Sequence, residues 1–131
     1  MEAKITIDAH SLFWYVDKDF NDKLSPLALQ LITEAESNGT IYVPVIVLME
    51  IAHLIERGRI NISFNNLMSH IEGSQSYHIV PIDAVLLKIA ISISGLEIHD
   101  RLILATAIIT NSTLVSKDRA VRGIGRVNVI W

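Results

Sequence analysis

VPVIVLMEIAHLIER, residues 43–57, is apolar through its middle except for Glu50 and His53. Its length and its lack of Gly or internal Pro predict a helix that begins at the proline and ends at Gly58. A carboxylate buried without a partner is energetically costly, so Glu50 needs an explanation. One explanation is that Glu50, His53 and Arg57 share a stripe of this helix and form a solvated edge. The alternative is a functional pocket, which depends on where the other acids of the chain fall.

Short β-branched runs alternate with helical patterns on both sides of this helix. Strands are predicted at residues 4–8, 40–43, 78–82, 113–116 and 127–130. Further helices are predicted at residues 10–16, 26–38, 64–72, 84–94 and 100–111. Ser25 and Asp83 are the expected N-caps of two of them. This alternation predicts a three-layer α/β/α architecture with a central, mainly parallel sheet.

The composition is that of a densely packed globular chain. Its 131 residues are enough for one domain with a real core and too few for two, so we expect a single domain over residues 1–131. Half of the residues are hydrophobic, yet no apolar run approaches the ~20 residues of a membrane helix. The N-terminal residues MEAKITID lack a signal-peptide pattern. We therefore expect a soluble, cytoplasmic protein without membrane contact. The absence of cysteine excludes disulfides and thiolate metal sites.

Charge is distributed unevenly along the chain. The net charge of −3 argues against a basic nucleic-acid coat. Residues 1–100 carry 13 acids and 6 bases, a balance of −7, whereas residues 101–131 carry one acid and five bases, a balance of +4. The basic segment is a candidate phosphate-contacting rim, with a solvated basic face as the alternative. Within it, Arg101 and Arg119 are candidate phosphate contacts because each adjoins an acid discussed next.

Four acids fall where ligand sites form in open α/β sheets. Asp8 ends the first predicted strand, Asp118 follows the fourth, Asp100 opens a helix and Glu50 lies within one. Each also has a structural explanation, as a turn residue, a helix cap or a surface charge. Ligands bind at the C-terminal ends of the strands of such sheets, so we expect these carboxylates to share one pocket.

Converging carboxylates repel one another, and a divalent cation relieves that repulsion. Oxygen ligands without Cys or a paired His motif favour Mg²⁺ or Mn²⁺ over Zn²⁺. Such an ion can activate water for attack on a phosphodiester. The four acids therefore predict a site for phosphodiester hydrolysis.

The segments IDAHSLFW, VPVIVLMEIAHLIERGRI, HDRLILATAI and LVSKDRAV, before the closing VNVIW, resemble those of the PIN-domain family. The likeness is strongest to the VapC toxins of toxin–antitoxin pairs, and the segments follow the family order over essentially the whole chain. The resemblance implies a PIN fold and Mg²⁺- or Mn²⁺-dependent endonucleolytic cleavage of RNA. It also implies a homodimer and a small antitoxin protein whose C-terminal segment covers the active groove.

The resemblance carries over to individual residues. The family's acids, which are the implied metal ligands and catalytic residues, match Asp8, Glu50, Asp100 and Asp118. Ser116 matches a Ser or Thr position that accompanies the last acid, and is a candidate substrate contact. Ala9 and Val47 depart from a common Thr and a frequent Ser, so two hydroxyls that orient water or carboxylates are missing. This departure bears on the rate more than on the metal site.

Other residues near these acids have simpler interpretations. His10 is a candidate substrate contact, with packing or a surface position as the alternative. Asp83 follows a strand but matches no acid of the family, so it is interpreted as a helix cap. Glu50 and His53 form a single E-x-x-H, which argues against a di-iron bundle because that site needs two copies. Trp14 is expected in the core or at an interface.

Three functions remain open from the sequence. The first is a metal-dependent ribonuclease acting as a toxin. The second is a catalytically silent PIN module that binds RNA or a protein, which the absence of Thr at position 9 favours. The third is a phosphoacceptor receiver domain with Asp83 as acceptor and Ser116 and Lys117 as its partners. A receiver, however, needs paired acids after its first strand, and it leaves Glu50 unexplained.

Overall fold

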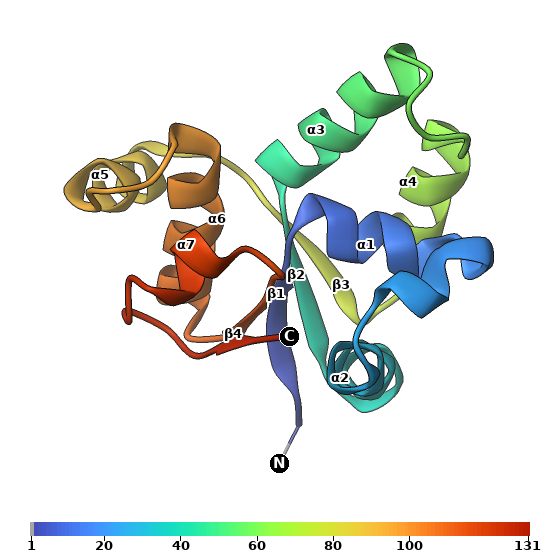
Figure 1. The fold of residues 1–131 in the computed structure, drawn as a ribbon, viewed down its shortest axis with the longest axis horizontal. Helices are drawn as coiled ribbons and strands as arrows, with labels where there is room; N and C mark the ends of the chain where they lie inside the picture. Colours follow the sequence, from blue (N-terminus) through green and yellow to red (C-terminus); the bar gives the residue numbers. More distant parts are fainter. Residues whose placement is uncertain (1) are drawn as a thin grey trace.

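The fold is a parallel sheet between two layers of helices (Figure 1). The computed structural model describes residues 2–131. The strands are β1 (Lys4–Ile7), β2 (Thr40–Pro44), β3 (Tyr77–Val80), β4 (Thr113–Val115) and β5 (Val129–Ile130). Their order is β3-β2-β1-β4-β5, and every neighbouring pair is parallel. The predicted sheet is confirmed, and it is entirely rather than mainly parallel.

The order of the strands reverses beside β1. The chain adds β2 and β3 on one side of β1, then crosses to add β4 and β5 on the other. In the register of β1 and β4, Ile7 lies opposite Val115, and the Asp8 N–H donates to the Val115 carbonyl at 3.4 Å. Such a reversal leaves a crevice beyond the C-terminal ends of the two strands.

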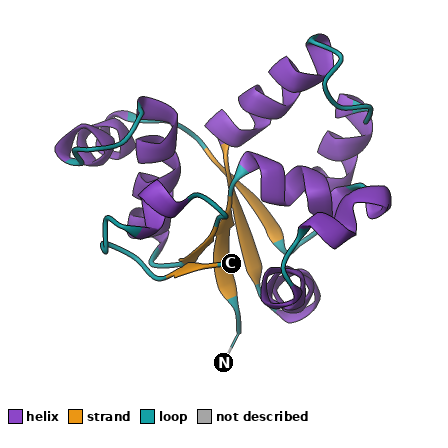
Figure 2. Cartoon of the chain, in the orientation of Figure 1, coloured by secondary structure: helices purple, strands orange, loops and turns teal. Residues whose placement is uncertain are grey.

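Helices cover both faces of the sheet (Figure 2). One layer holds α1 (Ala9–Val16), the 3₁₀ helix η1 (Lys18–Lys23), α2 (Pro26–Asn38), α3 (Val45–Glu56) and α4 (Phe64–Glu72). The other holds α5 (Ala84–Ser92), α6 (Ile98–Thr110) and α7 (Arg119–Arg122). The three-layer α/β/α prediction is therefore confirmed. None of the helices within residues 2–131 has the length and apolar character needed to cross a membrane.

Local sequence explains where these elements begin and what they bury. The Ser25 hydroxyl accepts a hydrogen bond from the Ala28 N–H at 3.0 Å, and the Asp83 carboxylate accepts one from the Leu86 N–H at 2.9 Å. Both N-cap predictions are thus confirmed. Ile5 and Ile7 on one face of β1 and Thr6 on the other are all fully buried, because helices cover both faces of the parallel sheet.

Several predicted boundaries shift. β3 ends at Val80 rather than at residue 82, since Pro81 has no N–H to donate to a neighbouring strand. The helix predicted to start at Asp100 starts at Ile98, and its N-cap is Glu97, whose carboxylate accepts from the His99 N–H at 3.0 Å. Asp100 therefore lies in the first turn of α6 and is not its cap.

Candidate active site

The four acids line one pocket of about 420 Å³ at the C-terminal edge of the sheet. Each acid comes from a different helix. Asp8 is the N-cap of α1 and Asp118 is the N-cap of α7, whereas Glu50 lies in the middle of α3 and Asp100 in the first turn of α6. The pocket lies where the strand order reverses between β1 and β4. The four acids therefore share one pocket, as the sequence predicts.

Two of the acids are held by the backbone. Asp8 accepts a hydrogen bond from the Ser11 N–H at 3.0 Å, and Asp118 accepts one from the Ala120 N–H at 2.9 Å, each through its Oδ1. The buried Ser116 fixes the turn before α7, because its hydroxyl accepts from the Asp118 N–H at 3.1 Å. Asp8 and Asp118, for which the sequence offered a turn position as the structural explanation, therefore cap helices through one carboxylate oxygen each and also line the pocket.

Glu50 is separated from the residues that share its predicted stripe. Its side chain is 30% exposed and faces the pocket. His53 and Arg57, by contrast, are exposed. The solvated-edge interpretation applies to those two residues and not to Glu50.

The pocket concentrates negative charge. Burial raises the pKa of Asp100 to about 6, helped by the charge of Asp118, the charge of Glu97, a side-chain hydrogen bond with Asp118 and the charge of Asp8. Burial also raises the pKa of Glu50; His99 opposes this, while Asp100, Asp8 and Glu97 add to it. Burial and neighbouring acids together outweigh the one basic neighbour, His99, that acts on Glu50. A cation at this position would lower the pKa of both acids.

The donor set suits a hard divalent cation. All four acids supply oxygen ligands, which Mg²⁺ and Mn²⁺ prefer. Within residues 2–131, no three His, Cys, Asp or Glu side chains lie close enough together to hold an ion as they stand. Mg²⁺ in proteins usually keeps several waters and takes only one or two carboxylates. Asp100 and Asp118, which line the pocket together and whose charges interact, fit that requirement, and further ligands require the other side chains to move inward.

Three residues at this site were not singled out from the sequence. Glu97 and His99 lie at the rim, where His99 Nδ1 is 3.5 Å from Glu97 Oε1 and 3.8 Å from Glu50 Oε1. Their position within one turn of Asp100 was the available signal. Ser11 also lines the pocket, and it is only 1% exposed. Within residues 2–131, its Oγ is the one buried side-chain oxygen or nitrogen without a hydrogen-bond partner. A hydroxyl left unpaired in this way suits a ligand or water in the pocket.

The candidate substrate contacts divide into two pairs. His10 and Ser116 line the pocket. Arg101 and Arg119 are not among the lining residues. Arg101 Nε donates to the Leu96 carbonyl at 2.8 Å, so this guanidinium secures the loop before α6. Arg119 is exposed in the first turn of α7.

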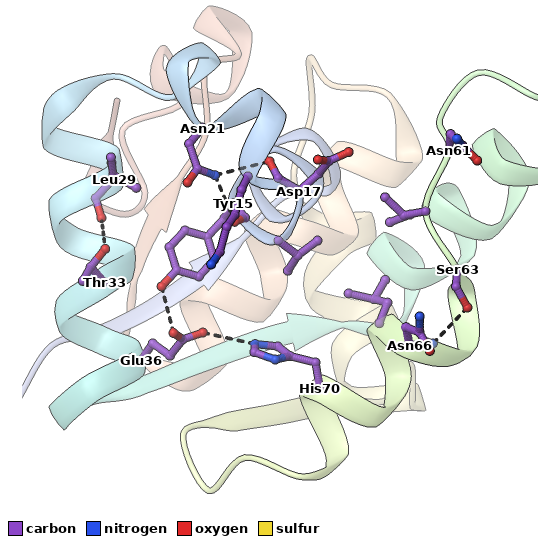
Figure 3. A pocket seen from close by; sticks show the side chains of 14 residues that line it. Tyr15, Asp17, Asn21, Leu29, Thr33, Glu36, Asn61, Ser63, Asn66 and His70 are labelled. Atoms are coloured by element: carbon purple, nitrogen blue, oxygen red, sulfur yellow. Dashed lines mark hydrogen bonds and ion pairs between the residues drawn. The ribbon is translucent and has the colours of Figure 1, made fainter.

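A second pocket of about 600 Å³ lies among α1, η1, α2 and α4 (Figure 3). Its half-buried carboxylate, Glu36, already has partners. Tyr15 Oη donates to it at 2.9 Å and Tyr77 Oη at 2.6 Å, while His70 Nε2 lies 3.2 Å away. These contacts tie α2 to α1, β3 and α4. Glu36 therefore joins elements and is not left for a ligand.

A family model described as "PIN domain" matches residues 5–127. The chain belongs to the PIN domain family. The match covers Asp8, Glu50, Asp100 and Asp118, so all four pocket acids lie inside the PIN domain.

Solved structures share the fold of this PIN domain at low sequence identity. VapBC2 from Rickettsia felis bound to a promoter DNA fragment has a TM-score of 0.70 at 16% identity, covering 98% of both chains. FitAcB from Neisseria gonorrhoeae has a TM-score of 0.65 at 18% identity, covering 97% of this chain and 96% of that one. DNA-bound VapBC from Salmonella typhimurium has a TM-score of 0.64 at 15% identity, covering 98% and 97%. Among curated proteins, no sequence matches the chain.

Proposed function

We propose that this PIN domain, as a single domain over residues 1–131, is a metal-dependent endoribonuclease and the toxin of a toxin–antitoxin pair. The observation that carries the proposal is the convergence of Asp8, Glu50, Asp100 and Asp118 in one pocket at the reversal of strand order. Burial, together with repulsion from neighbouring acids, raises the pKa of Asp100 and Glu50, which supports a cation at the site.

The acids divide the work of phosphodiester hydrolysis. Asp100 and Asp118 are the primary ligands for Mg²⁺ or Mn²⁺, and Asp8 completes the set. The ion supplies a polarised water and neutralises charge on the phosphate. Glu50 stands on a different element, and its raised pKa suits it to take the proton of the attacking water. The buried Ser11 hydroxyl orients water in place of the hydroxyls absent at Ala9 and Val47.

The partners follow from the same family membership. The domain shares its fold with chains of VapBC2 and FitAB structures described as bound to DNA fragments, and with a chain of a structure described as a toxin–antitoxin complex from Klebsiella pneumoniae. For this chain we propose a protein antitoxin as binding partner, RNA as substrate and a homodimer as the assembly. Exposed aliphatic side chains on α3 and α5 supply apolar surface for such contacts: Met49, Val85, Leu87 and Ile91.

The receiver-domain alternative loses support from the position of Asp83. Its carboxylate caps α5, and it does not line the pocket that holds Asp8, Asp100 and Asp118. A phosphoacceptor must lie beside the acids that hold its cation. The silent-module alternative keeps the same fold and is separated from the enzyme only by measurement.

The test is cleavage of a single-stranded RNA by stoichiometric protein with Mg²⁺ or Mn²⁺. We expect cleavage by the unmodified protein, loss of it in Asp8→Asn, and full retention in Asp83→Asn, which changes an acid outside the pocket. Equal cleavage by all three proteins would indicate a contaminating nuclease. No cleavage by any of them, with Mn²⁺ binding also absent, would favour the silent module.

A further inference from the structure

Beside the acids, the same pocket carries an aromatic and basic cluster, here called the aromatic rim: His10, Trp14, Lys117 and Trp131. The His10 and Trp14 ring centroids are 5.4 Å apart, and those of Trp14 and Trp131 are 5.9 Å apart. Lys117 Nζ lies over the Trp14 ring, 5.9 Å from its centroid. Trp14 is therefore the centre of the rim and contacts each of its other members.

The rim adjoins the four acids directly. His10, Trp14 and Lys117 line the acidic pocket. His10 and Trp14 are one turn apart on α1, the helix that Asp8 caps, and Lys117 precedes Asp118. A group bound against Trp14 would thus lie beside any phosphate bound to a cation that the acids hold.

The side chains of the aromatic rim are exposed or only partly buried, as in a binding surface and unlike a hydrophobic core. The neighbouring Phe13 is 5% exposed and belongs to the core. Trp14 and Trp131 are only partly buried, packing against the core while keeping surface in contact with solvent. His10 and Lys117 are exposed. Trp14, expected in the core or at an interface, packs against the core and also lines the pocket.

We propose that the aromatic rim is a nucleobase subsite, in which Trp14 stacks an unpaired base next to the scissile phosphate. Lys117 is exposed, so an incoming base displaces it from the Trp14 ring and its ammonium contacts the adjoining phosphate. The proposal rests on the proposed nuclease function for the place of that phosphate. Bases of an RNA duplex are already stacked on one another, so the ligand class is single-stranded RNA.

Stacking on an aromatic ring accepts any base, because every base has a π-face. The rim therefore selects for unpaired RNA more than for a sequence. RNA is favoured over a protein ligand because the rim combines π-surface with a cation and lies next to acids suited to phosphodiester chemistry.

The chain contains only two tryptophans, and both are in the rim. Their fluorescence therefore reports on this surface alone. The experiment titrates the full chain with a single-stranded RNA oligonucleotide in EDTA, so that binding is measured without cleavage. We expect quenching on binding. An abasic oligonucleotide of equal length should bind about 5- to 150-fold more weakly, the range for loss of one stacked base.

Substitutions locate the effect. Trp14→Leu should weaken RNA binding over the same range, with Trp131 as the remaining reporter, and Trp14→Phe should restore most of it. Lys117→Ala should weaken binding and reduce the slope of log affinity against log salt by about 0.7, the value for one phosphate contact to a single strand. Lys88→Ala is the matched control, because Lys88 is an exposed lysine on α5.

Equal affinity of the unmodified protein for the normal and abasic oligonucleotides would overturn the proposal, even if Trp14→Leu fails to fold. So would quenching by a peptide ligand without quenching by RNA. The readout is independent of cleavage. Base-dependent binding without cleavage in Mg²⁺ or Mn²⁺ would support the subsite and refute the nuclease, whereas cleavage without base-dependent binding would do the reverse.

Discussion

Two half-buried carboxylate sites in this PIN domain have opposite electrostatics. Burial on its own raises the pKa of Glu36, but hydrogen bonds from Tyr77, Tyr15 and His70, together with the charge of His70, bring it below its ordinary value. In the acidic pocket, burial and neighbouring acids raise the pKa of Asp100 and Glu50. The fold supplies hydrogen bonds that stabilise the ionised form of Glu36, whereas the surroundings of Asp100 and Glu50 destabilise their ionised forms.

This contrast separates a structural acid from the candidate functional acids. The Glu36 pocket is the larger of the two, yet its carboxylate has three partners from three elements. The acidic pocket is smaller, and its charge is left for something outside the chain. Strained electrostatics are a better guide to function here than the size of a cavity.

The largest expected difference between the regions is in activity. Glu50→Gln should lower RNA cleavage by about 10²- to 10⁴-fold, because it removes the proposed proton acceptor. Glu36→Gln, the same change in the other region, should leave cleavage per folded molecule unchanged. Initial rates with saturating Mn²⁺ measure both. Equal losses in the two variants would remove the distinction between the sites.

The next largest effect is on stability at the Glu36 site. Tyr77→Phe removes a hydrogen bond to a charged group and should lower the free energy of unfolding by about 1.5–3 kcal/mol. Tyr42→Phe is the control, because the Tyr42 hydroxyl makes no side-chain hydrogen bond within residues 2–131. Urea denaturation at pH 7 measures the difference, and equal stability of the two variants would contradict the assignment.

The loss of unfolding free energy in Tyr77→Phe should depend on pH, and the pKa of Glu36 fixes the direction of that dependence. Since the pKa of Glu36 is lowered in the fold, its ionised form stabilises the protein above its ordinary pKa of 4.5. That contribution is lost as pH falls through the lowered value. The deficit of Tyr77→Phe should therefore shrink at pH 3 to 4 in urea denaturation. A deficit that grows on acidification would contradict the pKa direction.

The acidic pocket should show the opposite stability effect, and a smaller one. The pKa of Asp100 is raised from 3.8 to about 6, so its charge destabilises the fold above pH 6 and ceases to do so as pH falls toward 4. Asp100→Asn should raise the free energy of unfolding at pH 7.5 by about 1 kcal/mol, after allowance for solvent screening. Urea denaturation in EDTA at pH 7.5 and pH 4 measures the gain and its loss. A destabilised Asp100→Asn at pH 7.5 would contradict the repulsion.

The smallest effect is expected at Ser11. Ser11→Ala removes a buried hydroxyl without a hydrogen-bond partner, so stability should stay the same or rise by about 1 kcal/mol. If that hydroxyl orients water, cleavage should fall by about 10-fold, the order expected for one hydrogen bond. Thermal unfolding and cleavage rates on one preparation test both. Unchanged cleavage would remove Ser11 from the site.

The fold and the four acids could be predicted from the sequence because their signals are local. Alternating apolar strands and capped helices indicated the layers, and Asp8, Glu50, Asp100 and Asp118 lie in segments that resemble those of a family. The places of Asp8 and Asp118 at strand ends, and of Glu50 and Asp100 in segments that match the family, were enough to predict a shared pocket.

The remaining features depend on contacts between distant segments. Nothing near Glu36 in sequence predicts that Tyr77 and His70 will reach it from β3 and α4. The meeting of Trp14 with Trp131 likewise needs the final strand to be placed beside β4. The start of α6 was predicted at Asp100 and lies at Ile98, because Glu97 and Asp100 both suit an N-cap and only backbone geometry separates them.

Calorimetric titration with Mn²⁺ tests the central claim most directly, because it reads the acids as cation ligands without requiring a substrate. Asp83→Asn, which changes an acid outside the pocket, is the control for Asp100→Asn. The account predicts that the unmodified protein and Asp83→Asn bind Mn²⁺ alike, and that Asp100→Asn binds it at least about 10-fold more weakly. Failure of the unmodified protein to bind Mn²⁺, or equal binding by all three proteins, would contradict it.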